Sequence, residues 1–232
     1  MRFNLEITFL SDWLVGSGLS DGARADAGLA RDARGLLYLP GRAIKGALRE
    51  SAHRLGLARP DLAPAETRLF GVDCRPASPE GLNKAGEAKS FNQPGALRVG
   101  EGRLPEAIEA LLLAAKTTDR AAWVTDLTVT RAQTALTEAR TARPHSLRTL
   151  ECGLPGLTFQ AELAVDNPAA FPGGDQWLQA YFRTLCALTK SLGGHRSRGL
   201  GRCRLTLDPA PAGTLVEPPP PLDFTTPAPG VN

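Results

Sequence analysis

The sequence predicts an α+β domain in which two strand–helix–strand units share one antiparallel sheet. Residues 3–9 and 157–165 alternate apolar and polar side chains with the period of two that is typical of a half-buried strand. Each of these stretches is followed, after connections of different length, by a helical pattern and by a short apolar strand. This order is the ferredoxin-like (RRM-like) βαββαβ arrangement, which places two helices on one face of the sheet.

The first unit begins with the strand at 3–9. Residues 11–32 are rich in Gly and Asp and predict a long, exposed loop, which leads to a short apolar strand at 36–39. A helix is expected from about 42 to 57, because its apolar residues recur on one side. Its second strand is expected at 96–99.

The second unit follows a helical pattern at 104–116 and a β-prone stretch at 122–131. A strand at 157–165, a helix at 175–192 and a strand at 200–207 complete it. We therefore expect one domain over 1–207, interrupted by insertions at about 11–35, 58–94 and 131–156. Residues 208–232 are rich in Pro and predict a flexible tail.

The charge and cysteine content give weak signals. The chain has 232 residues and a net charge of +3, which is too small to indicate nucleic-acid binding. Its cysteines are isolated in the sequence, so reduced, buried thiols are expected rather than a zinc site. The N-terminus does not resemble a signal peptide, and no apolar run reaches the about 20 residues of a membrane span. A cytoplasmic protein without a membrane partner is the expectation.

The most basic part of the chain is a glycine-rich stretch at 193–202, Gly-Gly-His-Arg-Ser-Arg-Gly-Leu-Gly-Arg. Glycine allows the backbone to approach a ligand closely, and each arginine supplies a fixed positive charge with forked donors. No acidic residue interrupts the stretch, so it suits a polyanion such as RNA. The candidate contacts here are His195, Arg196, Ser197, Arg198 and Arg202.

A second basic, glycine-containing element lies at 40–46, where a strand is expected to meet a helix. Arg42, Lys45 and Arg49 recur at a spacing that places them on one helix face, and free backbone N–H groups at the helix start also attract phosphate. Gly41 would allow RNA or a neighbouring subunit to come close. A solvated helix face would give the same pattern of basic residues.

The segment at 131–148 has four arginines, many Thr and Ala residues, and few large apolar side chains. Since it cannot bury itself well, a projecting hairpin or loop is expected. Arg131 and Arg140 could then lie along a partner nucleic-acid strand. A surface loop without a binding role would have the same composition.

These elements together resemble the RAMP superfamily, the RNA-binding proteins of CRISPR systems. Residues 36–49, Leu-Leu-Tyr-Leu-Pro-Gly-Arg-Ala-Ile-Lys-Gly-Ala-Leu-Arg, are similar to its strand, Pro-Gly and Lys-Gly signature, and 193–202 is similar to its glycine-rich loop. The arginine-rich segment and 157–162 are similar to the part that forms the family's thumb-like projection. The resemblance is closest to backbone subunits of type III effectors and to their related capping subunits.

The resemblance implies a crRNA-binding subunit of a type III-like effector complex in antiviral defence, which holds the guide backbone and shapes the guide–target duplex. Its implied partners are crRNA, target RNA and other effector subunits, including copies of itself or related RAMP proteins. RNA binding would need no cofactor. A cap on the repeat-derived 5′ handle of the guide is one alternative, and an adaptor without RNA is an alternative of a different class.

The resemblance also raises the question of target-RNA cleavage. Subunits that cut have an aspartate in the loop before the Pro-Gly signature, and Asp26 matches that position, with Asp21 and Asp32 as neighbours. Such a carboxylate could orient the attacking 2′-hydroxyl or hold Mg²⁺ or a similar divalent ion. The loop lacks the run of Ile and Gly found before that aspartate in cutting subunits. A structural RNA-binding role is therefore the main expectation, and a processing ribonuclease is disfavoured because the chain has only three His and two Tyr.

Overall fold

A four-stranded antiparallel sheet forms the centre of the molecule, which a computed structural model describes over residues 1–16, 27–72 and 93–207. Its strand order is β4 (Leu97–Val99), β7 (Thr158–Val165), β1 (Arg2–Phe9) and β8 (Cys203–Leu207). All three pairings are antiparallel, and Ile7 of β1 lies opposite Phe159 of β7 and Leu205 of β8. This order and these directions confirm the predicted ferredoxin-like fold.

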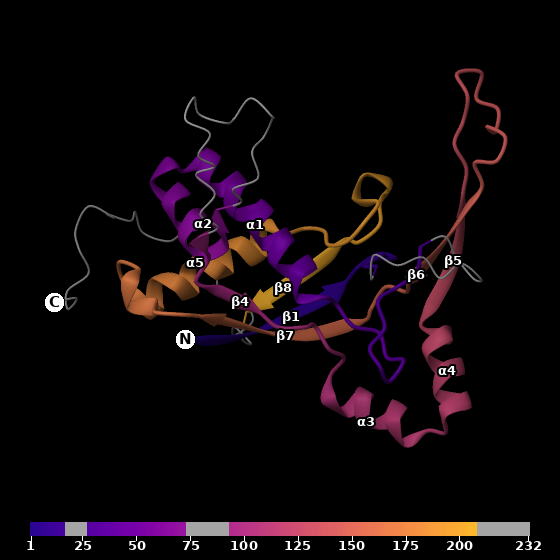
Figure 1. Cartoon of the computed structure of the whole chain (residues 1–232), viewed down its shortest axis with the longest axis horizontal. Helices are drawn as coiled ribbons and strands as arrows, with labels where there is room; N and C mark the ends of the chain where they lie inside the picture. The colour runs from indigo at the N-terminus through magenta and orange to yellow at the C-terminus, as the bar shows by residue number, and fades with distance from the viewer. Residues whose placement is uncertain (17–26, 73–92, 208–232) are drawn as a thin grey trace, which may run out of the picture.

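Two long helices cover one face of this sheet, α1 (Gly41–Ala58) and α5 (Gly174–Leu188), as Figure 1 shows. Alternate residues of β1 point into the layer between sheet and helices, where Leu5, Ile7 and Phe9 are fully buried. Phe3 meets Phe182 of α5 edge to face, with ring centroids 5.4 Å apart. The predicted helix at 175–192 is shorter in the structure, because the chain leaves helical geometry at Thr189.

The segment predicted as an exposed loop, 11–32, is largely buried where the structure describes it, at 11–16 and 27–32. In its described part Trp13 is fully buried and stacks on Phe9, with ring centroids 4.5 Å apart, and its indole N–H donates to the Leu154 carbonyl oxygen. Leu29 and Ala30 are buried as well. These few apolar residues extend the core beyond the sheet. They were not recognised as core residues because most of their neighbours in the sequence are polar.

The predicted strand at 36–39 is also different in the structure. Leu37 and Leu39 each make an isolated bridge, to Arg31 and to Gly102, and no continuous strand forms. The second insertion contains the short helices η1 (Pro60–Leu62) and α2 (Ala63–Phe70) and the strands β2 (Gly71–Val72) and β3 (Gln93–Pro94). Residues 73–92 and the predicted tail at 208–232 lie outside the described residues.

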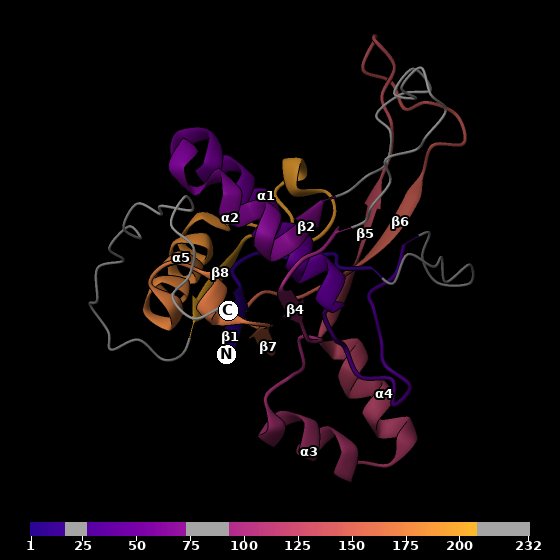
Figure 2. The same cartoon turned by 60° about the vertical axis from the view of Figure 1, so that its left-hand side comes forward.

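A hairpin of β5 (Thr128–Gln133) and β6 (Arg148–Gly153) projects away from the body in both Figure 1 and Figure 2. This confirms the projection expected from the arginine-rich composition. The helices α3 (Glu106–Ala114) and α4 (Thr117–Asp126) precede it. The β-prone stretch at 122–131 was therefore predicted wrongly in its first half, because Val124 reaches the core from a helix.

Candidate nucleic-acid interface

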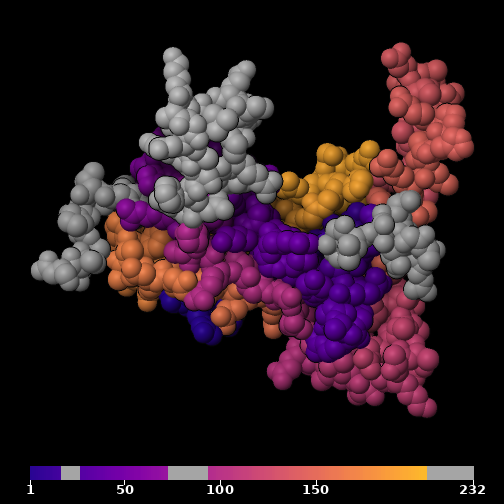
Figure 3. Space-filling model, in the orientation of Figure 1, coloured from indigo at the N-terminus to yellow at the C-terminus, as the bar shows by residue number. Residues whose placement is uncertain are grey.

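The two glycine-containing elements, which are far apart in the sequence, form one cleft. Its volume is about 390 Å³. Helix α1 forms one wall, the glycine-rich loop at 193–202 forms the other, and residues 14–16 lie between them. The residues that line it are Leu14, Val15, Gly16, Ala43, Gly46, Ala47, Glu50, Gly193, Gly194 and Arg196. The space-filling view shows the loop, in yellow, between α1 and the hairpin (Figure 3).

Glycine is required in this loop because the backbone runs against neighbouring backbone. A Cβ atom on Gly193 would lie 2.4 Å from the Leu14 carbonyl oxygen, and one on Gly201 would lie 2.2 Å from that of Leu192. Both residues have a positive φ that favours glycine. The Gly194 amide donates to Leu14, and the Gly201 amide donates to Asp12. The loop is therefore held to residues 12–14 by its own backbone.

The polar and charged side chains of the loop point outward, whereas Leu200 is buried in the core. His195, Arg196, Ser197, Arg198 and Arg202 are all exposed. The short helix η4 (Arg196–Arg198) presents three of them, and His195 before it has a left-handed backbone conformation. Of these residues Arg196 lines the cleft, and the others lie on the exposed surface of the loop.

Two arginines of the loop contact other elements. Arg196 Nη1 lies 2.6 Å from Glu50 Oε2 on α1, and Arg198 Nη1 donates to Gln133 Oε1 of β5 at 2.5 Å. The Arg202 side chain is exposed, while its amide donates to the Ser11 hydroxyl. The sequence did not indicate that Glu50 and Gln133 contact the loop, because the arginines they pair with lie more than sixty residues away in the chain.

The basic residues of α1 have different surroundings. Arg42 is exposed at the first turn, where no acidic residue lies and Pro40 caps the helix without a side-chain hydrogen bond. Lys45 Nζ donates to the Leu97 carbonyl oxygen at 2.7 Å, and Arg49 Nη2 donates to that of Gly71 at 3.2 Å. Burial, and then the nearby charge of Arg49, lower the pKa of Lys45. Neither Lys45 nor Arg49 lines the cleft.

The glycines of α1 also differ from each other. A Cβ atom on Gly41 would lie 2.3 Å from the Val99 carbonyl oxygen, so glycine here lets α1 begin directly against the end of β4. This close packing against β4 is sufficient to explain why residue 41 is glycine, without the close approach of RNA that the sequence suggested. A Cβ on Gly46 would meet nothing within 4 Å, and Gly46 lines the cleft.

The hairpin places its two predicted RNA contacts at opposite ends. Arg131 lies near the base and forms an ion pair with Asp12, whose carbonyl oxygen accepts from the Gly201 amide of the loop. Arg140 lies in the exposed tip with a positive φ of 59°. Arg131 is thus linked to the glycine-rich loop through Asp12, whereas Arg140 lies in the projecting tip.

The predicted catalytic residue, Asp26, lies outside the described residues, as does Asp21, so cleavage stays a prediction. Asp32 is described and has a structural role. Its carboxylate accepts hydrogen bonds from the amides of Arg34 and Leu36 and from the Arg34 guanidinium. Burial alone would raise the pKa of Asp32, but these hydrogen bonds lower it overall.

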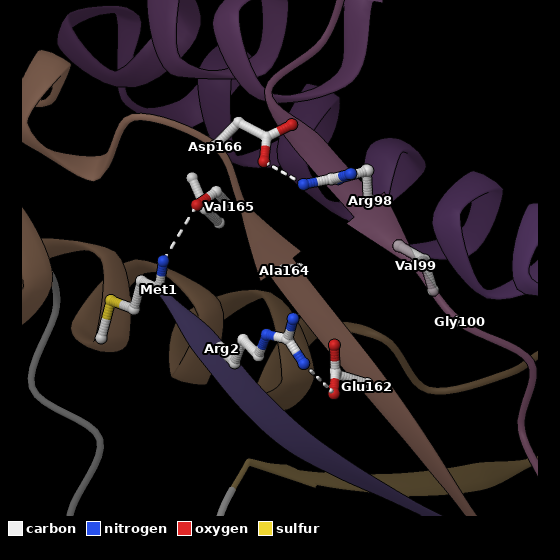
Figure 4. Close-up of a pocket in the computed structure, with 9 residues that line it drawn as sticks. All are labelled: Met1, Arg2, Arg98, Val99, Gly100, Glu162, Ala164, Val165 and Asp166. Atoms are coloured by element: carbon white, nitrogen blue, oxygen red, sulfur yellow. Dashed lines mark hydrogen bonds and ion pairs between the residues drawn. The ribbon is translucent and has the colours of Figure 1, made fainter.

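The outer face of the sheet is a second candidate surface. It carries a pocket of about 360 Å³ in which Arg2 pairs with Glu162 and Arg98 pairs with Asp166, as Figure 4 shows. The outward-facing residues of the four described strands include no aromatic side chain. RRM domains stack RNA bases on aromatic residues of this face. This face therefore lacks the groups for that mode of binding, and its arginines in the pocket are already paired with acids.

Potential metal ligands and cysteine thiols are the other reactive groups of the described ranges. Within them no three His, Cys, Asp or Glu side chains gather in a way that could hold a metal ion. Cys152, Cys186 and Cys203 are free and buried, as expected, whereas Cys74 lies outside the described residues. Burial raises the pKa of Cys186 and of Cys203 to about 12, so neither is a reactive thiolate near neutral pH. No described helix has both the length and the apolar character to cross a bilayer.

Comparison with known proteins agrees with this architecture. The family model of the RAMP superfamily matches residues 6–204. The search of curated proteins found no match. The fold places the chain among α+β proteins of the ferredoxin-like class, and the family match then identifies it: the chain belongs to the RAMP superfamily.

Chains of several solved CRISPR complexes have a similar fold. A chain of the type III-B Cmr-beta complex bound to cognate target RNA is 11% identical, with a TM-score of 0.62 over 89% of this chain and 97% of that chain. A chain of the same complex in its apo state is 11% identical, with a TM-score of 0.59 over 90% and 98%. A chain of a type IV-B CRISPR complex is 17% identical, with a TM-score of 0.50 over 94% and 95%.

Proposed function

We propose that the chain is a crRNA-binding subunit of a multi-subunit, type III-like CRISPR effector complex. The observation that carries the proposal is the cleft between α1 and the glycine-rich loop, in which both glycine-containing elements meet. Membership of the RAMP superfamily supports it, as do structural relatives from CRISPR complexes, one of which is a complex bound to cognate target RNA.

The chemistry of this surface suits an RNA backbone. Exposed arginines of the loop and the start of α1, which has no side-chain cap, offer positive charge and N–H donors that suit phosphate oxygens. Binding of this kind accepts any guide sequence. The arginines of the hairpin would continue the contact along the strand, so that each copy grips a short stretch of guide.

Co-expression tests the proposal in the assembled state. The chain is produced with its neighbouring genes and a repeat-spacer array, the complex is purified, and the bound RNA is sequenced. We expect discrete guide RNAs with a common repeat-derived end. Purification with no RNA, or with random host fragments only, would contradict the proposal and favour an adaptor role.

Paired substitutions then locate the interface. The double variant Arg198→Ala/Arg202→Ala changes the loop, and Arg2→Ala/Arg204→Ala removes the same charge from the outer sheet face. We expect only the loop variant to weaken RNA binding, with the slope of log K against log salt reduced by roughly one to two. Equal effects of the two double variants would place the RNA elsewhere.

A further inference from the structure

Glu50 introduces a negative charge into a surface that otherwise suits phosphate. It lies on α1, and among the described residues that line the cleft it alone has a carboxylate. Its side chain is 43% exposed and is held by Arg196, with Nη1 and Oε2 2.6 Å apart. An exposed ion pair of this kind adds little to folding stability. A contribution to folding stability therefore does not account for the presence of Glu50 in the cleft.

The chemistry of nucleic-acid backbones indicates what this carboxylate can bind. A phosphate group offers only acceptor oxygens, which a carboxylate repels. The 2′-hydroxyl of ribose is the hydrogen-bond donor that an RNA backbone has and a DNA backbone lacks. Apart from Glu50 and Arg196, the cleft is lined by glycines and by residues with apolar side chains, so Glu50 supplies the only side-chain acceptor among its described lining residues.

We infer that Glu50 determines the specificity of the cleft for ribose over deoxyribose, which rests on the RNA-binding function proposed above. Its carboxylate accepts a hydrogen bond from a 2′-hydroxyl, while Arg196 fixes its orientation and binds the adjacent phosphate. DNA offers no donor at this point, so its backbone meets only the repulsion of the carboxylate. Glu50 thus weakens the binding of polyanions in general and restores affinity for RNA alone.

The test compares three single strands of the same mixed sequence, made of RNA, of DNA and of 2′-O-methyl RNA. Each is titrated against full-length wild type, Glu50→Ala and Glu50→Gln at one salt concentration. The measured quantity is the ratio of the Kd for DNA to the Kd for RNA. Glu162→Ala is the matched control, because Glu162 is also an exposed acid paired with an arginine, Arg2, but on the outer sheet face.

We expect Glu50→Ala to lower this ratio roughly tenfold, with tighter DNA binding and weaker RNA binding, as the loss of a hydrogen bond to a charged group predicts. Glu50→Gln should lower the ratio less, because glutamine keeps a hydrogen-bond acceptor at this position. For wild type, 2′-O-methyl RNA binds like DNA. Glu162→Ala leaves the ratio unchanged. Because Glu50 is exposed, all variants retain the thermal unfolding midpoint of wild type.

Several outcomes overturn the inference. A ratio that Glu50→Ala leaves unchanged shows that Glu50 acts only on Arg196 or on net charge. Wild type that binds RNA and DNA equally well has no such specificity. Wild type that binds none of the three strands, together with a purified complex that contains no guide RNA, contradicts the proposed function itself, which distinguishes that failure from failure of the inference alone.

Discussion

Two glycines of one helix show how a single contact decides what a residue does. Gly41 and Gly46 belong to the same sequence signature at the start of α1. Gly41 lies against backbone of β4 and of the residue after it, whereas the position of a Cβ on Gly46 is open. One glycine is therefore needed for folding, and the other leaves space in the cleft.

Substitution by alanine should separate these two roles. Gly41→Ala forces a Cβ to within 2.3 Å of the Val99 oxygen, so we expect a loss of about 1–3 kcal/mol in the free energy of unfolding. Gly46→Ala should raise that free energy by about 0.5–1 kcal/mol, because alanine favours a helix interior. Urea denaturation of both variants measures the difference. A destabilised Gly46→Ala protein would show that Gly46 is packed.

At the scale of elements, a partly buried ion pair helps to join the hairpin to the body, in addition to the pair of Arg131 with Asp12 and the backbone hydrogen bonds of Trp13 with Gly153. Glu151 of β6 accepts hydrogen bonds from both terminal nitrogens of Arg31, at 2.8 and 2.5 Å, and from the Leu29 amide. The hydrogen bonds from Arg31, together with its charge and the backbone contact, lower the pKa of Glu151 below its ordinary value of 4.5, against the effect of burial. The carboxylate is therefore favoured in the folded state.

This linkage gives a pH-dependent prediction. Because the folded-state pKa is lowered, Glu151 stabilises the fold above pH 4.5, and this stabilisation is lost as the pH falls through the folded-state value. Glu151→Gln should cost about 1–2 kcal/mol at neutral pH. The difference from wild type should shrink in acid. Chemical denaturation across this pH range measures it.

Glu162→Gln is the control for this measurement, because the pair of Glu162 with Arg2 is much more exposed. We expect almost no change in unfolding free energy from that substitution at any pH. A Glu151→Gln variant that is as stable as wild type at neutral pH would show that the pair does not hold the hairpin.

At the scale of the whole molecule there is a division of roles: the packed core stabilises the fold, and the tip of the projecting hairpin is available for binding. The tip at 134–147 makes hydrogen bonds mainly within itself, such as Thr134 to Ser146 and Thr137 to Thr141. Leu136 and Leu147 in the tip are 58% and 70% exposed. The tip therefore adds reach and charge but little buried surface.

Removal of the tip tests this division. Gln133 pairs with Arg148 across the hairpin, so an Asn-Gly turn can replace residues 134–147. We expect an unchanged thermal unfolding midpoint and weaker RNA binding, since Arg140 and Arg143 are lost. The variant Arg140→Ala/Arg143→Ala keeps the tip and separates its charge from its shape. A clearly lower midpoint for the shortened protein would contradict the division.

The strands and helices of the core were predictable because their signals are local. The alternation in β1 and β7 and the apolar stripes of α1 and α5 follow from which side chains face the sheet–helix layer. The glycine-rich loop and the projecting hairpin were visible for the same reason, since their compositions cannot form a core. Local signals failed at Trp13 and in α4, where packing against distant residues overrides composition.

The sequence by itself therefore determined the fold class, the order of elements and the residues that carry charge. Only the tertiary structure decided how that charge is used. It brings α1 and the loop together as one cleft, and it pairs Arg196 with Glu50 and Arg131 with Asp12. It also directs Lys45 to the backbone of β4. The physical reason is that secondary structure depends on neighbouring residues, whereas an ion pair or a cleft depends on segments that meet only after folding.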